Sequence, residues 1–393
     1  MAFPRSVAAL LRASVATTGQ SPEEVVAHWP PEAFEGLAEA ARFHGVPGYV
    51  HRAVAQSDGI PLSERSLLQD LRRETVRRHL RTIGDLRFVA EVLEGADIPW
   101  LVFKGPALAV PVHGSPELRS YSDLDLLVPA ECFGDAAQQL ETAGCRVPEH
   151  DWRYLREGLK GEIDVFMPSG THLDLHWHLI NEIPTRQPYT IDLEGLFARH
   201  RIVAIGSDHV PTLAYVDTAV YVALHAMLSP RQRLVGMKDL QLLVDGSQWP
   251  LEELMAHARG WGAELPFRTA LLQMQRSIGP LATRSPTSTT GGDRLWGLTC
   301  RTAGRLSPLE RQDGTASVGR LVSRSVRGDQ KASLGLLARN AGLVAKQGLR
   351  GVRGASESGG SVSSGTPLEE AASLAERARF FAAIAAQHGT GGV

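Results

Sequence analysis

The sequence contains few cysteines: only Cys132, Cys145 and Cys300 occur in 393 residues. The three lie far apart and none forms a Cys-x-x-Cys pair, which excludes a disulfide framework and a structural zinc site built from cysteines. Sparse, unpaired cysteines are typical of a reducing compartment. We therefore expect the protein to be cytoplasmic.

The sequence also lacks an excess of charge of one sign. Lys and Arg number 41 and Asp and Glu number 43, so the formal net charge is −2. No overall basic field draws the chain toward nucleic acid or toward an anionic membrane surface. Any polyanion contact is expected to be local, and nucleic acid is not the favoured partner.

Long apolar runs are absent as well. No stretch approaches the roughly 20 apolar residues that a membrane-spanning helix needs, so no membrane partner is expected. The N-terminal apolar run at residues 7–11 has no convincing cleavage site after it and predicts a helix rather than a signal peptide. With 43% hydrophobic and 21% charged residues, the chain can form two or three domains with full-sized cores.

Hydrophobic periodicity divides the chain into four regions. Residues 1–97 are helical, and they include an apolar stripe formed by Leu80, Ile83, Leu86, Ala90 and Leu93. Residues 98–205 read as a mixed α/β core, 206–282 as a helical cap, and 283–393 as a helical C-terminal region with Ser/Gly-rich linkers at 283–293 and 351–366. The arginines at positions 72–81 alternate with acids and predict a solvated helix face.

Within the central region the spacing of apolar residues alternates between strand and helix patterns. Strands are expected at 99–103, 124–128, 163–167, 172–177 and 200–205, and helices at 106–112 and 130–143. Pro168-Ser169-Gly170 predicts a hairpin between the third and fourth of these strands. The predicted fold class is α+β, with a small mixed sheet between helical N-terminal and C-terminal segments.

Two acids in the sequence DLDLLV are spaced to hold a metal ion. Asp123 and Asp125 alternate with leucines, so both carboxylates project from one face of a strand while the leucines enter the core. Two acids on one strand and a third on a neighbouring strand form an oxygen site suited to Mg²⁺. The best third acid is Asp174 in the sequence LDLHW, where it also could accept the proton of an attacking hydroxyl; Asp164 is its competitor.

A Lys-Gly turn precedes these acids. Lys104 and Gly105 stand where a strand is expected to turn into a helix, and backbone amides at a helix start favour a phosphate. Glycine allows close approach of the backbone. Arg119 and Ser122 lie just before the acids, and the planar fork of Arg119 can hold either a triphosphate oxygen or an acid pair.

Four side chains in the fourth expected strand and just after it suggest a zinc site as an alternative to the three-acid magnesium site. His172, Asp174, His176 and His178 share one strand face, but at about 3.3 Å per residue they span too far to converge on one ion. We expect His176 to be a hydrogen-bond partner behind the acids. His225, in the apolar segment YVALHAML, is predicted to be a core histidine.

The order of these motifs, with a strand, KG, a helix, RSYSDLDLLV and then DLHW, resembles the polymerase-beta-type nucleotidyltransferase superfamily in its uncharacterised bacterial branch. The resemblance covers about residues 25–245 and includes His225, Lys238 and Asp239 in a later segment. The usual turn of the superfamily is Gly-Gly or Gly-Ser close to the acids, whereas here 18 positions are counted from Gly105 to Asp123. This difference leaves the phosphate contacts of the turn open.

The resemblance implies roles for individual residues. Gly105 would bind nucleotide phosphates, Asp123 and Asp125 would bind two Mg²⁺ ions, and Asp174 would complete the catalytic site. A nucleoside triphosphate, with ATP first, would donate its nucleoside monophosphate to a hydroxyl of an unknown acceptor and release pyrophosphate. The alternative is a non-catalytic relative that acts as a binding or antitoxin-like regulatory module.

Overall fold

The computed structural model describes residues 3–281 apart from 18, 149 and 230–232, together with 367–387 and the isolated positions 309, 335 and 338. Both Ser/Gly-rich segments and Cys300 lie outside these residues. The chain starts with short helices and one long helix: α1 (Arg5–Val15), α2 (Pro22–Ala27), η1 (Pro31–Phe34), α3 (Leu37–His44), α4 (Pro47–Val54) and α5 (Leu62–Glu94). None of the helices in the described part is both long and apolar enough to cross a membrane.

A four-stranded mixed sheet forms the centre of the molecule. Its strands are β1 (Leu101–Val102), β2 (Asp123–Leu127), β3 (Glu162–Phe166) and β4 (His172–His176), in the order β1-β2-β4-β3. β2 and β4 are parallel, and the β1–β2 and β3–β4 pairs are antiparallel. The connections contain α6 (Pro106–Ala109), η2 (Ala130–Cys132), α7 (Phe133–Thr142) and α8 (Trp152–Glu157). The α+β fold class and the β3–β4 hairpin are thus confirmed.

The strand expected at 200–205 belongs to a separate hairpin. After α9 (Ile183–Arg186) and α10 (Leu193–Ala198), β5 (Arg201–Ile205) pairs with β6 (Asp208–Thr212) in a two-stranded sheet. The sequence did not predict β6. The hairpin turns over Gly206 with a positive φ of 67°. The expected boundary at residue 205 therefore falls inside one hairpin.

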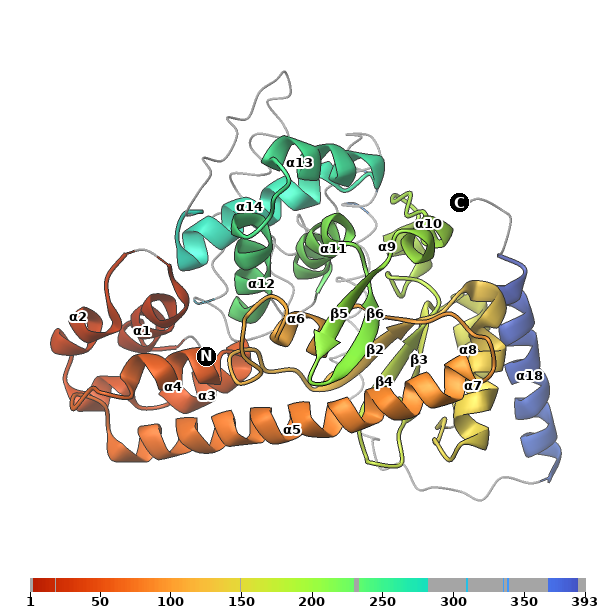
Figure 1. Cartoon of the computed structure of the whole chain (residues 1–393), viewed down its shortest axis with the longest axis horizontal. Coiled ribbons are helices and arrows are strands. Elements are labelled where there is room, and N and C mark those ends of the chain that lie inside the picture. The colour runs from red at the N-terminus through yellow and green to blue at the C-terminus, as the bar shows by residue number, and fades with distance from the viewer. Residues whose placement is uncertain are drawn as a thin grey trace.

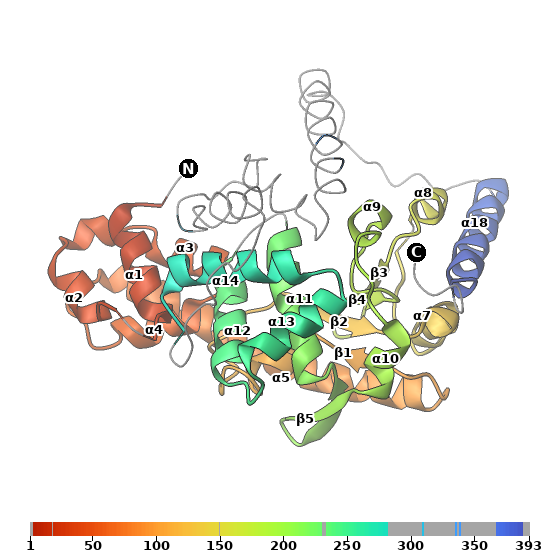
Figure 2. The same ribbon diagram turned by 90° about the horizontal axis from the view of Figure 1, so that it is seen from above.

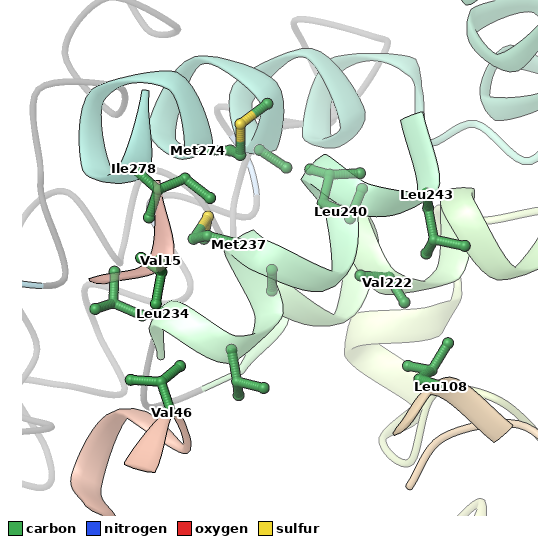
Figure 3. Packing of buried hydrophobic residues seen from close by; sticks show 14 of the residues in the cluster. Val15, Val46, Leu108, Val222, Leu234, Met237, Leu240, Leu243, Met274 and Ile278 are labelled. Atoms are coloured by element: carbon green, nitrogen blue, oxygen red, sulfur yellow. The ribbon is translucent and has the colours of Figure 1, made fainter. Parts of the chain in front are cut away.

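The helices after this hairpin share a hydrophobic core with the N-terminal helices. α11 (Tyr215–Leu228), α12 (Leu234–Asp245), α13 (Leu251–Gly260) and α14 (Glu264–Ile278) pack together above the sheet (Figure 1). Figure 3 shows Met237 and Leu240 of α12 with Met274 of α14, and Val15 of α1 beside Leu234. Two helical regions that are far apart in the sequence therefore stabilise each other.

A second core covers one face of the sheet. Leu124 and Leu126 of β2 and Leu173 and Leu175 of β4 are buried in it with residues of α5 and α7. The predicted stripe on α5 is correct at Leu86 and Leu93 but wrong at Leu80, which is 63% exposed. The long helix extends past the sheet toward the N-terminal helices (Figure 1), and near Leu80 the buried face of the helix is formed by His79 and Thr82 instead.

The last described helix packs back onto this second core. α18 (Pro367–Ala385) lies against α7 and α8 at the end of the molecule opposite α1–α4, as Figures 1 and 2 both show. Phe380 is fully buried against Phe133 and Trp152. Arg377 pairs with Glu141 of α7. The helices α5, α7 and α18 therefore cover one face of the sheet, and the polar groups of the strands project from the opposite face.

Candidate active site

The face of the sheet away from the second core is polar. Side chains alternate along each strand, so the leucines of β2 and β4 enter the core and the residues between them project from the opposite face. The acidic and histidine side chains on this face are Asp123, Asp125, Glu162, Asp164, His172, Asp174 and His176. Five carboxylates and two imidazoles are thereby gathered over three strands.

Asp125 and Asp174 lie directly opposite each other in the parallel β2–β4 pair. Asp125 is 1% exposed, whereas the side chain of Asp174 is 19% exposed. Burial, together with the charge of Asp125, raises the pKa of Asp174 to about 7. Burial would also raise the pKa of Asp125, but Lys104 and His176 more than offset it and hold that pKa well below its usual range. One acid of the pair is thus firmly ionised and its neighbour titrates near neutral pH.

His176 lies between two carboxylates. Its Nε2 is 3.3 Å from Oδ1 of Asp125 and its Nδ1 is 3.1 Å from Oε2 of Glu162. Asp125, Asp174 and His176 offer ligand atoms that all lie within 4.8 Å of one another. Carboxylate oxygens and imidazole nitrogen are common ligands of divalent metal ions, so this donor set fits such an ion.

A second group of possible ligands shares Asp174. Nε2 of His172 is 2.7 Å from Oδ1 of Asp164 and 3.4 Å from Oδ1 of Asp174, and these three residues could also hold an ion. His178 belongs to neither group, and its Nδ1 accepts a hydrogen bond from the backbone of Ile180 at 3.0 Å. The four side chains of the rival zinc hypothesis therefore do not converge, as the length of the strand predicts.

Lys104 and Gly105 form the turn between β1 and α6. Nζ of Lys104 is 2.5 Å from Oδ1 of Asp125, so the lysine points along the sheet to the acids. Gly105 has a φ of 50°, and a Cβ there would stand 3.3 Å from the carbonyl oxygen of Asp123 and 3.4 Å from the ring of Tyr121. Both the left-handed conformation and the close packing require glycine.

Arg119 forms an acid pair, one of its two expected uses. Its Nε and Nη2 donate to the two carboxylate oxygens of Asp239 at 2.8 and 2.9 Å, and Nη1 donates to the carbonyl oxygen of Gly105 at 3.3 Å. Nε2 of His113 is 2.6 Å from Asp239, and the hydroxyl of Tyr49 is 2.8 Å from Nδ1 of His113. This buried network connects α4, the Lys-Gly turn and α12, and it gives Asp239 a structural position that the sequence did not reveal.

The long helix fixes the loop that leads into β2. Nη1 of Arg78 donates to the carbonyl oxygen of Tyr121 at 2.7 Å, and Nδ1 of His79 is 2.9 Å from the Tyr121 hydroxyl. Arg72 pairs with Glu117 at 2.7 Å. These contacts set where Ser122 and Asp123 leave the loop, so part of the arginine-rich face of α5 has a positioning role rather than being only solvated.

A pocket of about 300 Å³ lies between the Lys-Gly turn, β2 and the helices α11 and α12. Six of the seven site residues expected from the sequence contribute to its lining: Lys104, Gly105, Arg119, Ser122, Asp123 and Asp125. Asp174, the seventh, lies on β4 beside Asp125 and outside that lining. The volume of the pocket falls at the lower end of the range for small-molecule sites. Neither candidate metal group in the described residues includes Asp123, which lies one strand repeat from Asp125.

The pocket wall formed by α11 and α12 contains residues that the sequence did not assign. The expectation that His225 is a core residue is wrong: it is exposed and lines the pocket, while Tyr221 lines the same wall one helical turn away. Ser229 and the exposed Arg233 extend this wall. Tyr221 and His225 of α11 and Ser229 just after its end recur at four-residue spacing, which was the available signal.

Comparison with known proteins agrees with this geometry. A family model described as uncharacterised nucleotidyltransferase matches residues 30–279, which include the Lys-Gly turn, both groups of acids and the helices that line the pocket. No curated protein matches the chain.

Proposed function

The chain belongs to this family of uncharacterised nucleotidyltransferases, and we propose that it transfers a nucleoside monophosphate from a nucleoside triphosphate, ATP first, to an acceptor hydroxyl with Mg²⁺. One observation carries the proposal. Asp125 and Asp174 are directly opposed on parallel strands, and Asp125 also lines a pocket that begins at the Lys-Gly turn. A paired carboxylate beside a small-molecule pocket is the arrangement that metal-assisted phosphoryl chemistry needs.

The nucleoside triphosphate is assigned to the pocket between the turn and α11–α12. Lys104 and Ser122 line it, and Arg233 is an exposed cation at the start of α12. Because Arg119 already pairs with Asp239 through two nitrogens, its role is to hold the turn through the carbonyl of Gly105. We assign phosphate contacts to Lys104, Gly105 and Ser122, and a positioning role to Arg119.

Metal ions are assigned to Asp123, Asp125 and Asp174, with Asp123 reaching an ion on the pocket side. When bound, Mg²⁺ ions would neutralise the charge that develops on the reacting phosphate. The residues do the remaining work: Asp125 stays ionised at any pH near neutrality, since its pKa is held low, and Lys104 holds the opposite charge close to the triphosphate site.

Asp174 is assigned as the proton acceptor. Without a bound metal its pKa is about 7, and a bound cation would favour the ionised form that a general base requires. The acceptor oxygen would attack the α-phosphorus and form a new P–O bond, while the bond from that phosphorus to the oxygen bridging to the β-phosphorus breaks. The hydroxyl proton passes to Asp174, and the bond electrons leave with pyrophosphate.

The acceptor is assigned to the β3–β4 side of the acids. Asp174 lies on that side of Asp125, and the exposed Asp164 adds further negative charge there. A polyanion such as RNA is repelled by this surface, which also agrees with the neutral overall charge. A small molecule, a sugar or a protein hydroxyl is therefore the favoured acceptor class.

Calorimetry of ATP and GTP with Mg²⁺ tests the proposal. Wild-type protein is expected to bind at least one of them, and Asp125→Asn is expected to lose the binding, while Asp164→Asn on the outer strand keeps it. Because Asp125 is buried, Asp123→Asn serves as a second variant, and thermal unfolding checks that each is folded. If neither the wild-type protein nor any variant binds ATP or GTP, the proposal is contradicted and a non-catalytic module is favoured.

A further inference from the structure

His176 is a buried imidazole that lies between the carboxylates of Asp125 and Glu162. It is 3% exposed, and within the described chain neither of its ring nitrogens, nor Oδ1 of Asp125, makes a hydrogen bond of acceptable geometry. Buried polar groups are usually hydrogen-bonded, whereas Oδ1 of Asp125 is held here by its ion pair with Lys104 and the ring nitrogens lie beside the carboxylates of Asp125 and Glu162. Phe103 packs edge-on against the ring, with the two ring centroids 5.0 Å apart.

The position of this ring matches that of a metal ligand. Ligand atoms bound to one ion at about 2.1 Å lie roughly 3–4 Å apart. Nε2 of His176 is 3.3 Å from Oδ1 of Asp125, and the ligand atoms of Asp125, Asp174 and His176 all lie within 4.8 Å of each other. On the other side of the ring, Oε2 of Glu162 is 3.1 Å from Nδ1. A carboxylate on the far nitrogen is how metal-binding histidines are usually oriented.

We infer that His176 is itself a ligand, so that one metal site of this protein is formed by Asp125, Asp174 and the imidazole of His176, with Glu162 orienting the ring. The inference deepens the proposed function and rests on it for the role of the bound ion. It differs from the three-acid site expected from the sequence, in which His176 only supported the acids from behind.

An imidazole ligand changes which ion the site prefers. Mg²⁺ favours oxygen ligands and keeps several of its waters, whereas imidazole suits Mn²⁺, Co²⁺ and other transition metals. The buried position of His176 leaves little room for a full water shell on that side. The site is therefore expected to bind Mn²⁺ at least tenfold more tightly than Mg²⁺ in the absence of nucleotide.

The matched control lies on the same strand. His172 is also paired with an acid, Asp164, at 2.7 Å, but it belongs to the other group of possible ligands and is absent from the Asp125 group. His176→Gln and His172→Gln thus remove the same chemical group from two positions four residues apart on one face. Only His176→Gln is expected to change the coordination of an ion bound by Asp125.

The test is electron spin echo spectroscopy of Mn²⁺ bound to the nucleotide-free full-length protein. Nitrogen coupling from a directly bound imidazole is expected in wild type and in His172→Gln and is lost in His176→Gln. Coupling that survives in His176→Gln, or that disappears in His172→Gln, overturns the inference. If His176→Gln does not fold, the wild-type affinities decide, and equal binding of Mn²⁺ and Mg²⁺ contradicts it.

The same samples separate this inference from the proposed function. Nitrogen coupling in a protein that does not transfer nucleotide leaves the imidazole ligand in place and refutes the transfer reaction. Nucleotide transfer without any nitrogen coupling supports the transfer reaction and refutes the imidazole ligand, since the acids alone then hold the ion. Absence of Mn²⁺ binding to wild-type protein, with and without nucleotide, overturns both.

Discussion

Nζ of Lys104 lies 2.5 Å from Oδ1 of Asp125, in a pair whose acid is buried and whose lysine is 18% exposed. Burial would lower the pKa of the lysine, but the charge of Asp125 more than offsets this and raises it. Both partners are therefore charged, and Lys104 is the counterion of the acid. Since His176 and Lys104 approach the same carboxylate oxygen, a metal ion that binds Asp125 has to share or displace the ammonium group.

Replacing Lys104 by methionine should strengthen metal binding. Lys104→Met keeps the length of the side chain and removes the competing charge, so Mn²⁺ affinity without nucleotide should rise about tenfold, or about 1.4 kcal/mol. A buried acid left without its partner destabilises a protein by about 3–5 kcal/mol, so the metal-free variant should unfold at a lower temperature and regain stability with Mn²⁺. Calorimetry and thermal unfolding measure the two effects.

Lys160→Met is the control for this prediction. Lys160 pairs with Glu182 at 2.8 Å outside the pocket, so its loss should leave metal affinity unchanged. Weaker metal binding in Lys104→Met than in wild type would mean that the ammonium group does not compete for Asp125.

The stability of the metal-free protein should depend on the charge of Asp174. Its folded-state pKa is about 7, above the unfolded value of about 3.9, so the folded state holds the proton more tightly. Stability is thus lost as pH rises from about 4 to 7, by about 2–4 kcal/mol. Asp174→Asn should abolish this part of the pH dependence. Denaturant unfolding with a chelator at pH 5 and pH 8 tests it, and equal losses in both proteins would refute the assigned pKa.

Asp239 should matter for both stability and nucleotide binding. Asp239→Asn leaves Arg119 buried without a charged partner, which should lower the free energy of unfolding by about 3–5 kcal/mol. The carbonyl of Gly105, which Arg119 holds, should then be less well positioned, so nucleotide affinity in the variant at low temperature should also fall. Glu252→Gln, at an exposed position of α13, should change neither. Unchanged unfolding of Asp239→Asn would show that the pair is dispensable.

His225 should affect ligand binding without affecting folding. Its side chain is exposed to the pocket, so His225→Ala should change the free energy of unfolding by less than about 0.5 kcal/mol. Leu224→Ala, one residue away in the core, should cost about 2–5 kcal/mol. Nucleotide affinity should fall several-fold only in His225→Ala. A destabilisation of His225→Ala as large as that of Leu224→Ala would restore the core assignment.

The sequence predicted the acids because their placement depends on local alternation. Leucines on either side of Asp125 and Asp174 determine which face each acid occupies, and a single register between two short strands then brings them together. The pairing of Arg119 with Asp239 could not be predicted in this way. The two residues are separated by 120 positions, and only the packing of α12 on the α/β core makes them neighbours.

His225 and His176 show what spacing along the sequence cannot predict about a histidine. His225 sits in an apolar helix, and periodicity alone places it in a core, but α11 leaves that turn open to the pocket. His176 was expected to be a hydrogen-bond partner of the acids, and its Nε2 lies 3.3 Å from Oδ1 of Asp125; that it also binds the metal is our inference. Which face of a helix meets a cavity and how a ring is rotated are set by tertiary packing rather than by spacing along the chain.

The position of the transferred phosphorus tests the central claim most directly. Full-length protein is incubated with Mg²⁺ and an extract of acceptors, once with ATP labelled at the α-phosphate and once with ATP labelled at the γ-phosphate. Nucleotidyl transfer predicts that the α label alone enters an acceptor, that pyrophosphate is released, and that Asp123→Asn and Asp174→Asn abolish the labelling. Entry of the γ label instead, or α labelling that persists in both variants, would contradict it.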